Sequence, residues 1–269
     1  MRFYDARNNM EFDKNHPLWQ QMFKTKAGTV RQSLNREGFA IAMQSRDLRL
    51  LPSVTTLSNI IDGFGTFGAG AAWGRSMTLQ AVDDVGKHDP TAIKSRAFEL
   101  MTEARDAGQA NHAIVEGYIN AELSGQEYPI LAAEDLDMAR TVRATIARDV
   151  DENIVCVERT IASNNWMMGG RVDIECKDTV IEMKFPKLAR KPKASEMAQS
   201  CAYAKMLGKQ RSCLFMWDSA KRRVDVHWVT TDGCLMDLMC RARDLFVALV
   251  ELWIGSETYS VYLGQEVEF

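Results

Sequence analysis

The chain has 269 residues, 46% of them hydrophobic, which is enough for one large domain with a substantial core. Its 33 basic and 36 acidic side chains give a formal net charge of -3 at pH 7, which argues against a protein that coats nucleic acid over its whole surface, because phosphate binding depends on basic side chains. The N-terminus is polar without a signal peptide, and no segment approaches the roughly 20 apolar residues of a membrane span, so we expect a cytoplasmic protein of a bacterium or phage-infected host cell, with no membrane partner.

The first fifty residues are polar and mixed in charge, and we interpret residues 1–50 as an N-terminal extension of one domain at residues 51–269. Short helices are expected there over residues 16–24 and 28–36. One hypothesis for this extension is an arm that clamps DNA or closes a passage.

A capped helix is expected over residues 51–63, before a Gly-rich stretch at residues 63–70. That stretch lacks the glycine spacing and the lysine of a phosphate-binding loop, so we interpret it as a turn that precedes a helix over residues 71–85. Nucleotide binding is not expected at this turn.

A long helix is predicted over residues 91–123, and it carries His112 and Glu116 on one face because they are four residues apart. A lone histidine on a helix is more often structural or exposed than a ligand. Imidazole can nevertheless complete a carboxylate site as a nitrogen ligand. The role of His112 therefore depends on the residues that the fold brings next to it.

One helix and three strands are expected next, over residues 134–149, 154–162, 166–175 and 179–185. Apolar and polar residues alternate on both sides of Lys177 and Asp178, which is typical of a hairpin. Pairing of its two strands would bring Asp173 next to Glu182, since side chains alternate between the faces of a sheet.

Glu182 and Lys184 share one face of their strand, so the hairpin gathers two carboxylates and an ammonium. Adjacent carboxylates repel each other, and a divalent cation relieves this repulsion. Oxygen ligands suit Mg²⁺ or Mn²⁺, which would polarise a scissile phosphate and lower the pKa of a bound water. Lys184 would then orient or deprotonate that water, or neutralise charge on the phosphate. The alternative is a surface hairpin whose Glu and Lys face solvent.

A helix is predicted over residues 194–207, with Ser195 as its N-cap and Gly208 as its C-terminal stop. Gln199 and Tyr203 lie four residues apart on this helix, where they can reach the charged cluster or a DNA phosphate. Alone, the same pair is more typical of the edge of an amphipathic helix.

A basic run without an acid extends from Lys184 to Lys193, and beside a metal site we expect it to contact phosphate, whereas alone it would be a solvated loop. Its DNA-binding candidates are Lys187, Arg190, Lys191 and Lys193. The last expected elements are strands over residues 212–217 and 223–229 and a helix that Asp232 caps and that ends near Trp253.

Together these motifs resemble, in order and approximate spacing, the RecB-like nucleases of the PD-(D/E)XK superfamily. The matching segments are Gly108-x-x-x-His112-x-x-x-Glu116, Gly170-Arg171-Val172-Asp173, Glu182-x-Lys184 and Gln199-x-x-x-Tyr203. The segment at residues 51–56 is similar to the entry of the nuclease domain in mitochondrial genome maintenance exonucleases and phage exonucleases. The resemblance spans about residues 51–229.

The resemblance implies roles for these residues. The implied metal ligands are His112, Asp173, Glu182 and the carbonyl of Met183. The implied catalytic group comprises Asp173, Glu182, Lys184, Gln199 and Tyr203, the last two supporting the site or holding DNA. The family often has Asp where this chain has Glu182, which adds one methylene. Glu116 and Glu158 are second-tier candidates, and Glu158 matches a position that is often acidic in such domains.

Some members of the family hold an iron–sulfur cluster through one early cysteine and three near the C-terminus. The six cysteines of this chain lie between Cys156 and Cys240 and include no C-x-x-C pair. We therefore expect no iron–sulfur cluster, and Mg²⁺ or Mn²⁺ as the cofactor. Thiols within apolar patterns also indicate a reducing compartment and no disulfide framework.

The fold that the resemblance implies is α/β, with a restriction-endonuclease-like core of a mixed β-sheet flanked by helices and with additional N-terminal helices. The implied function is a metal-dependent DNA nuclease, an exonuclease that hydrolyses phosphodiester bonds from free DNA ends, with recombination, repair or replication proteins as further partners. One alternative is a catalytically idle or partner-dependent DNA-binding domain of the same fold. Another is an α-rich enzyme with coincidental motifs, which predicts His112 and Gln199 far from Asp173.

Overall fold

The computed structural model describes residues 3–13, 15–25, 32–34, 36–43, 50–65, 69–187, 189–231 and 233–254. The chain divides into two compact units. The first unit comprises residues 1–60, 160–171 and 232–269, and the second comprises residues 61–159 and 172–231. The predicted extension at residues 1–50 lies in the first unit, whereas every predicted site residue lies in the second.

The first unit contains two small antiparallel sheets, two short helices and the long helix α8 (Gly233–Ile254) among its described residues. Its strands are β1 (Phe3–Asp5), β2 (Met10–Glu11), β5 (Leu50–Pro52), β3 (Phe23–Thr25) and β4 (Gln32–Leu34), and its short helices are α1 (Pro17–Met22) and α2 (Arg36–Met43). Gly169 is needed for close packing here, because a Cβ at this position would lie 2.4 Å from the Cβ of Tyr4.

Two expectations for this part of the chain need correction, and a third is not tested. The helix predicted over residues 28–36 is wrong at Gln32–Leu34, which pairs as a strand with Phe23–Thr25. The helix predicted over residues 51–63 is α3, at Val54–Gly65, and it follows strand β5. The predicted cap Asp232 lies outside the described residues.

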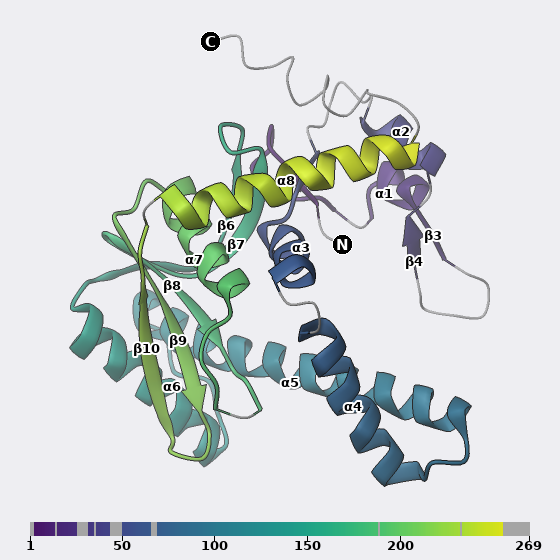
Figure 1. Ribbon diagram of the computed structural model, residues 1–269. Coiled ribbons are helices and arrows are strands. Elements are labelled where there is room, and N and C mark those ends of the chain that lie inside the picture. The colour runs from purple at the N-terminus through teal and green to yellow at the C-terminus, as the bar shows by residue number, and fades with distance from the viewer. Residues whose placement is uncertain are drawn as a thin grey trace. The chain divides into compact units, whose positions relative to one another are not determined.

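The second unit is built on a five-stranded sheet in the order β10-β9-β8-β7-β6 (Figure 1). The strands are β6 (Ile154–Ser163), β7 (Met168–Cys176), β8 (Thr179–Lys184), β9 (Arg211–Asp218) and β10 (Arg223–Val229). Residues 160–163 of β6 and 168–171 of β7 are counted with the first unit. Strand β8 is antiparallel to β7 but parallel to β9, and β9 is antiparallel to β10. The sheet is therefore mixed, and a helix provides the crossover that the parallel pair requires.

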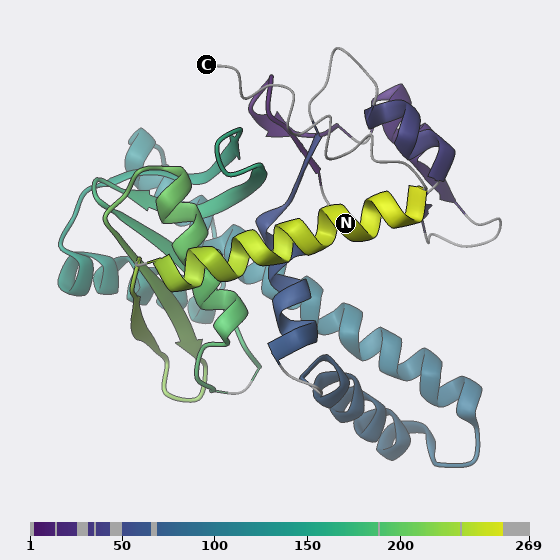
Figure 2. The same ribbon diagram turned by 45° about the horizontal axis from the view of Figure 1, so that its top comes forward.

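Helices α5 (Pro90–Ser124) and α6 (Ala133–Thr145) cover one face of this sheet, and α7 (Ala194–Met206) covers the other (Figure 1). The π-helical turn η1 (Ile146–Val150) follows α6, and α4 (Ala69–Val85) packs against α5. Figure 2 shows α4 lying along the first half of α5. Asp89 fixes the start of α5, because its carboxylate accepts hydrogen bonds from the backbone N–H groups of Thr91 and Ala92.

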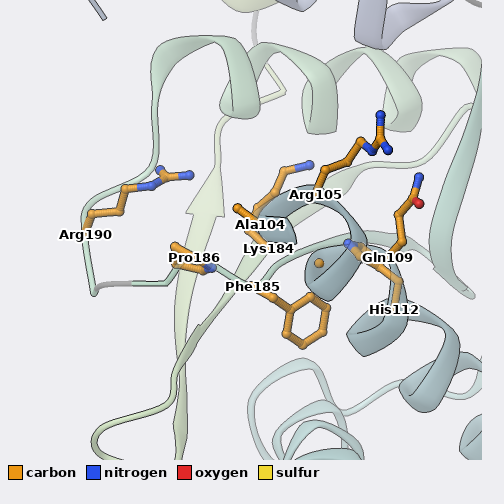
Figure 3. A pocket seen from close by; sticks show the side chains of 9 residues that line it. Ala104, Arg105, Gln109, His112, Lys184, Phe185, Pro186 and Arg190 are labelled. Atoms are coloured by element: carbon orange, nitrogen blue, oxygen red, sulfur yellow. The ribbon is translucent and has the colours of Figure 1, made fainter. Parts of the chain in front are cut away.

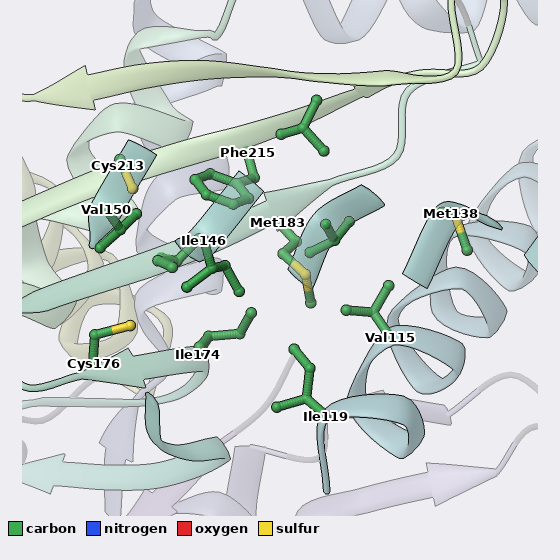
Figure 4. Packing of buried hydrophobic residues seen from close by; sticks show 13 residues of the cluster. Val115, Ile119, Met138, Ile146, Val150, Ile174, Cys176, Met183, Cys213 and Phe215 are labelled. Carbon is green, nitrogen blue, oxygen red and sulfur yellow. The ribbon is translucent and has the colours of Figure 1, made fainter. Parts of the chain in front are cut away.

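The core of the second unit lies between α5, α6 and one face of the sheet (Figure 4). Val115, Met138, Ile174, Ile181 and Phe215 are among its buried side chains. Because strand side chains alternate, the apolar contacts of Ile174 and Ile181 fix which residues face the other side of the sheet, where α7 packs.

Helix α7 begins at Ala194, as predicted, but its N-cap is another residue than expected. Lys193 is the N-cap, and its backbone N–H donates to the carboxylate of Glu196 at 2.9 Å, while Ser195 is a buried residue of the first turn. The prediction of Ser195 as N-cap is therefore wrong. Gly208 follows the helix in the left-handed region at a φ of +66°, as expected of a C-terminal stop.

The order of one long helix, three strands, a helix and a fourth strand confirms the predicted fold class, a mixed α/β sheet flanked by helices and consistent with a restriction-endonuclease-like core. Helices α1 and α2 supply the additional N-terminal helices. Across the residues that the structure describes, no helix has the length and apolar character of a bilayer span.

Candidate metal and phosphate site

The hairpin of β7 and β8 places the two acidic candidates together. Its register pairs Ile174 with Ile181 and Glu175 with Val180, and continuing it by one step sets Asp173 opposite Glu182. Both carboxylates lie on the face opposite the apolar core and are buried, with 8% and 3% of their surface exposed. Asp173 and Glu182 therefore lie next to each other just beyond the last paired residues, where the hairpin was expected to bring them.

Asp173 also takes part in the backbone pairing of the hairpin. The backbone N–H of Met183 donates to Asp173 Oδ2 at 2.7 Å, beyond the last paired residues of the ladder. A side-chain carboxylate thus replaces a backbone acceptor where the strands end. The Met183 side chain lies in the core, and a role for its carbonyl as a ligand stays a prediction.

The carboxylate of Glu182 has one satisfied and one unsatisfied oxygen. Oε1 accepts hydrogen bonds from Lys184 Nζ at 2.6 Å and from Gln199 Nε2 at 2.8 Å. Oε2 is buried and has no hydrogen-bond partner among the described residues. Burial, followed by the negative charge of Asp173, raises the pKa of Glu182 to about 7. Such a carboxylate is costly without a further positive partner.

Lys184 is held in the same cluster by two partners. Its Nζ contacts Glu182 Oε1, and Gln199 Oε1 lies 3.4 Å away. Burial acts to lower the pKa of this ammonium, but the charges of Glu182 and Asp173 outweigh burial and raise the pKa above its ordinary value. The side chain therefore stays protonated at neutral pH.

Helix α5 brings His112 to the same place. Its Nδ1 lies 3.5 Å from Asp173 Oδ1, and its ring meets the ring of Phe185 edge to face, with centroids 5.0 Å apart. One ligand atom from each of His112, Glu158 and Asp173 lies within 4.8 Å of the others. Glu158 has a φ of +53°, which is uncommon for a residue with a side chain in a strand.

The group of three residues with ligand atoms close together, His112, Asp173 and Glu158, thus includes the second-tier candidate Glu158. Glu182 is adjacent to this group through Asp173, while Glu116 is half-buried one turn beyond His112 and lies outside the group. A glutamate in a strand gives no local sequence signal of this role, because its position depends on the unusual backbone conformation at residue 158.

The distances oppose the hypothesis of coincidental motifs. That hypothesis predicts His112 and Gln199 far from the carboxylates, yet they lie 3.5 Å from Asp173 and 2.8 Å from Glu182. Gln199 Nε2 is also 3.3 Å from the hydroxyl of Tyr203. Tyr203 is only 1% exposed, so it has no surface on which a nucleobase could stack.

The four basic candidates differ in their partners. Arg190 makes a two-pronged ion pair with Glu196, with distances of 2.8 and 2.6 Å, and Lys193 pairs with Asp62 at 3.3 Å. Lys187 and Lys191 are exposed and have no ion pair within the described part of the chain. These two lysines are therefore the more available for a phosphate.

A cavity of about 300 Å³ opens beside the cluster (Figure 3). Helix α5 forms one side, and the segment after β8 forms the other. Its lining consists of Ala104, Arg105, Gly108, Gln109, His112, Lys184, Phe185, Pro186 and Arg190. Arg105 and Gln109 were not identified from the sequence, although their spacing of seven and three residues before His112 places them on its face of α5.

The side chains present fit a hard divalent cation. Carboxylates of Asp173, Glu158 and Glu182 and the imidazole of His112 are oxygen and nitrogen donors of the kind that Mg²⁺ and Mn²⁺ accept. Among the residues that the structure describes, the buried Oε2 of Glu182 has no hydrogen-bond partner, and a bound cation would supply one. The arrangement can therefore hold one cation next to Lys184.

No protein-family model and no curated protein matches this chain in sequence. Among solved structures, it is similar to an alkaline exonuclease from Laribacter hongkongensis, with a TM-score of 0.37 and 17% identity over 52% of this chain and 79% of that one. The same exonuclease with dAMP gives a TM-score of 0.33 and 19% identity over 52% and 80%. The structure of a protein called SSO0001 is similar with a TM-score of 0.29 and 13% identity, over 42% of this chain and 57% of that one. These scores identify no family for this chain.

Proposed function

We propose that this protein is a divalent-metal-dependent deoxyribonuclease of the PD-(D/E)XK superfamily. One observation carries the proposal: two buried carboxylates, an imidazole nitrogen and a lysine ammonium meet where the β7–β8 hairpin ends. If these residues served stability alone, the burial of Asp173 beside Glu182 would be costly, because one oxygen of Glu182 has no hydrogen-bond partner in the described part of the chain.

His112, Glu158, Asp173 and Glu182 would hold the ion, which when bound would polarise the scissile phosphate and lower the pKa of a water. Lys184, held by Glu182 and Gln199 beside these ligands, would orient or deprotonate that water or neutralise charge on the phosphate. Gln199 keeps this ammonium and Glu182 in place, since it contacts both.

The finer assignment is to the RecB-like nucleases, and within them to exonucleases that act on free DNA ends in recombination, repair or replication. The order and spacing of the motifs from Gly108 to Tyr203 support it. We assign Mg²⁺ or Mn²⁺ as the ion. The exposed Lys187 and Lys191 would contact the phosphates of the strand next to the site.

The test incubates purified protein with end-labelled linear and closed circular DNA, single- and double-stranded, in Mg²⁺, Mn²⁺ or EDTA. Lys184→Ala is compared with Lys94→Ala, a control at an exposed lysine of α5 outside the cavity. We expect metal-dependent loss of linear DNA that Lys184→Ala abolishes and Lys94→Ala preserves. Intact DNA under every condition would favour an idle or partner-dependent DNA-binding domain, and an active Lys184→Ala would refute the role of this lysine.

A further inference from the structure

The cavity beside the charged cluster is kept open by a glycine. Gly108 lines it in the interior of α5, and a Cβ built at Gly108 would meet no atom within 4 Å. A glycine within a helix is destabilising relative to alanine. Nothing in the packing therefore requires Gly108, and its effect is to leave space next to His112 and Lys184.

The lining of this cavity combines a flat apolar surface with positive charge (Figure 3). Phe185 and Pro186 form the apolar part, and the Phe185 ring is held by its edge contact with His112. Arg190 and Lys184 bring the cationic part, and the ion pair with Glu196 fixes the guanidinium of Arg190. Aromatic surface next to cations suits the base and phosphate of one nucleotide.

We propose that this cavity binds one unpaired nucleobase of the strand that is cut, stacked on Phe185 beside the scissile phosphate. The inference rests on the proposed nuclease function and adds the residues that would hold the base next to the cut phosphate, with Phe185 as the stacking surface and Gly108 as the residue that leaves room for the base. A cavity of about 300 Å³ has the size of a single-nucleotide site. A base within a duplex is stacked between its neighbours and has to leave the helix before it can enter.

The experiment measures equilibrium binding of short fluorescent single-stranded oligonucleotides that carry one abasic residue, moved along the strand. Ca²⁺ replaces Mg²⁺ to occupy a site of oxygen ligands. With the wild-type protein we expect one position at which the missing base weakens binding by about 5- to 100-fold, which corresponds to the loss of one base–aromatic stack. Abasic residues elsewhere should change binding little.

Gly108→Leu fills the cavity without removing any side chain of the charged cluster. We expect this variant to lose the dependence on that base, so that intact and abasic strands bind equally weakly. Ala110→Leu is the matched control, since Ala110 is exposed, lies outside the cavity and sits two residues further along α5. It should bind like the wild type. If Gly108→Leu fails to fold, Gly108→Ala, whose Cβ has open space, should show a partial loss.

A second readout is cleavage in Mg²⁺ of duplexes with a matched or a mismatched terminal pair. The wild type should prefer the mismatched end, and Gly108→Leu should lose this preference while Ala110→Leu keeps it. The cavity assignment would be overturned if the wild type cut DNA but its binding changed at no abasic position, or if Gly108→Leu kept the same base dependence. Either result would leave the proposed nuclease function standing. A protein that neither binds nor cuts any of these strands would overturn the nuclease assignment and the cavity assignment together.

Discussion

Replacing Glu182 by glutamine should stabilise the protein when no metal is present. The pKa of this carboxyl rises from its ordinary 4.5 to about 7, because burial and the charge of Asp173 disfavour the ionised form. Each pKa unit corresponds to ~1.4 kcal/mol, so the ionised carboxylate costs the fold ~3 kcal/mol at about pH 8. Its contribution to stability is favourable below the ordinary pKa and is lost as the pH rises through 7.

Glu182→Gln removes this charge but keeps the volume and the oxygen that accepts from Lys184 and Gln199. Part of the gain is offset, because the new amide N–H₂ takes the place of an oxygen that has no hydrogen-bond partner in the described structure. We expect a net gain of ~1–3 kcal/mol at about pH 8, which raises the melting temperature by several degrees and shrinks toward zero near pH 5.

Glu196→Gln is the matched control, because Glu196 is also buried but its pKa moves in the opposite direction. Burial raises that pKa, yet the ion pair with Arg190 and the N–H of Lys193 outweigh burial and lower it below its ordinary value. Ionised Glu196 therefore stabilises the fold above its ordinary pKa, and this contribution is lost as the pH falls. Glu196→Gln should destabilise the protein at about pH 8.

Thermal unfolding followed by circular dichroism in EDTA, near pH 5 and at about pH 8, measures both variants against the wild type. Addition of Mg²⁺ or Mn²⁺ should then raise the melting temperature of the wild type more than that of Glu182→Gln, because a ligand of the ion has been weakened. The reasoning is refuted if Glu182→Gln is less stable than the wild type at about pH 8, or if its gain is the same at both pH values.

Three further predictions concern metal binding, DNA binding and the stability of helix α5. Asp173→Asn should abolish Mn²⁺ binding in calorimetry while the protein stays folded, since its amide oxygen can still accept from the N–H of Met183; retained affinity would exclude Asp173 as a ligand. Replacing both Lys187 and Lys191 by alanine should weaken DNA binding and reduce the slope of log affinity against log salt by about 1.5–2, because each phosphate contact releases a counterion; an unchanged slope would remove these lysines from the interface. Asp89→Ala removes the cap of α5 and should lower stability by ~1 kcal/mol in denaturant unfolding, with cleavage unchanged; a loss of cleavage would show that the capped end of α5 matters for activity.

The parts of the fold that follow local patterns were predictable from the sequence. Alternation around Lys177 gave the hairpin and the pairing of Asp173 with Glu182, because a shift by one residue would turn Ile174 and Ile181 out of the core. The strand at Gln32–Leu34 was missed because its partner strand Phe23–Thr25, and not its own propensity, determines its conformation.

The site was predictable where its residues follow the period of an element and not where they depend on tertiary contacts. His112, Gln199 and Tyr203 stand at helical spacings that the sequence displays. The pairing of Arg190 with Glu196 gives no such signal, since it depends on the path of a loop. The basic run therefore looked uniform in sequence, although the structure separates its ion-paired members from Lys187 and Lys191.

Three departures from locally favourable structure lie around this one place in the second unit. Glu158 adopts a positive φ, Gly108 stands in a helix interior, and Glu182 buries a carboxylate next to Asp173. Each is unfavourable for folding by ~1–3 kcal/mol on general grounds, and a sequence selected for stability alone would remove all of them. Their meeting beside Lys184 is explained if an ion and a nucleotide bind there, because bound ligands offset the strain that the metal-free fold retains.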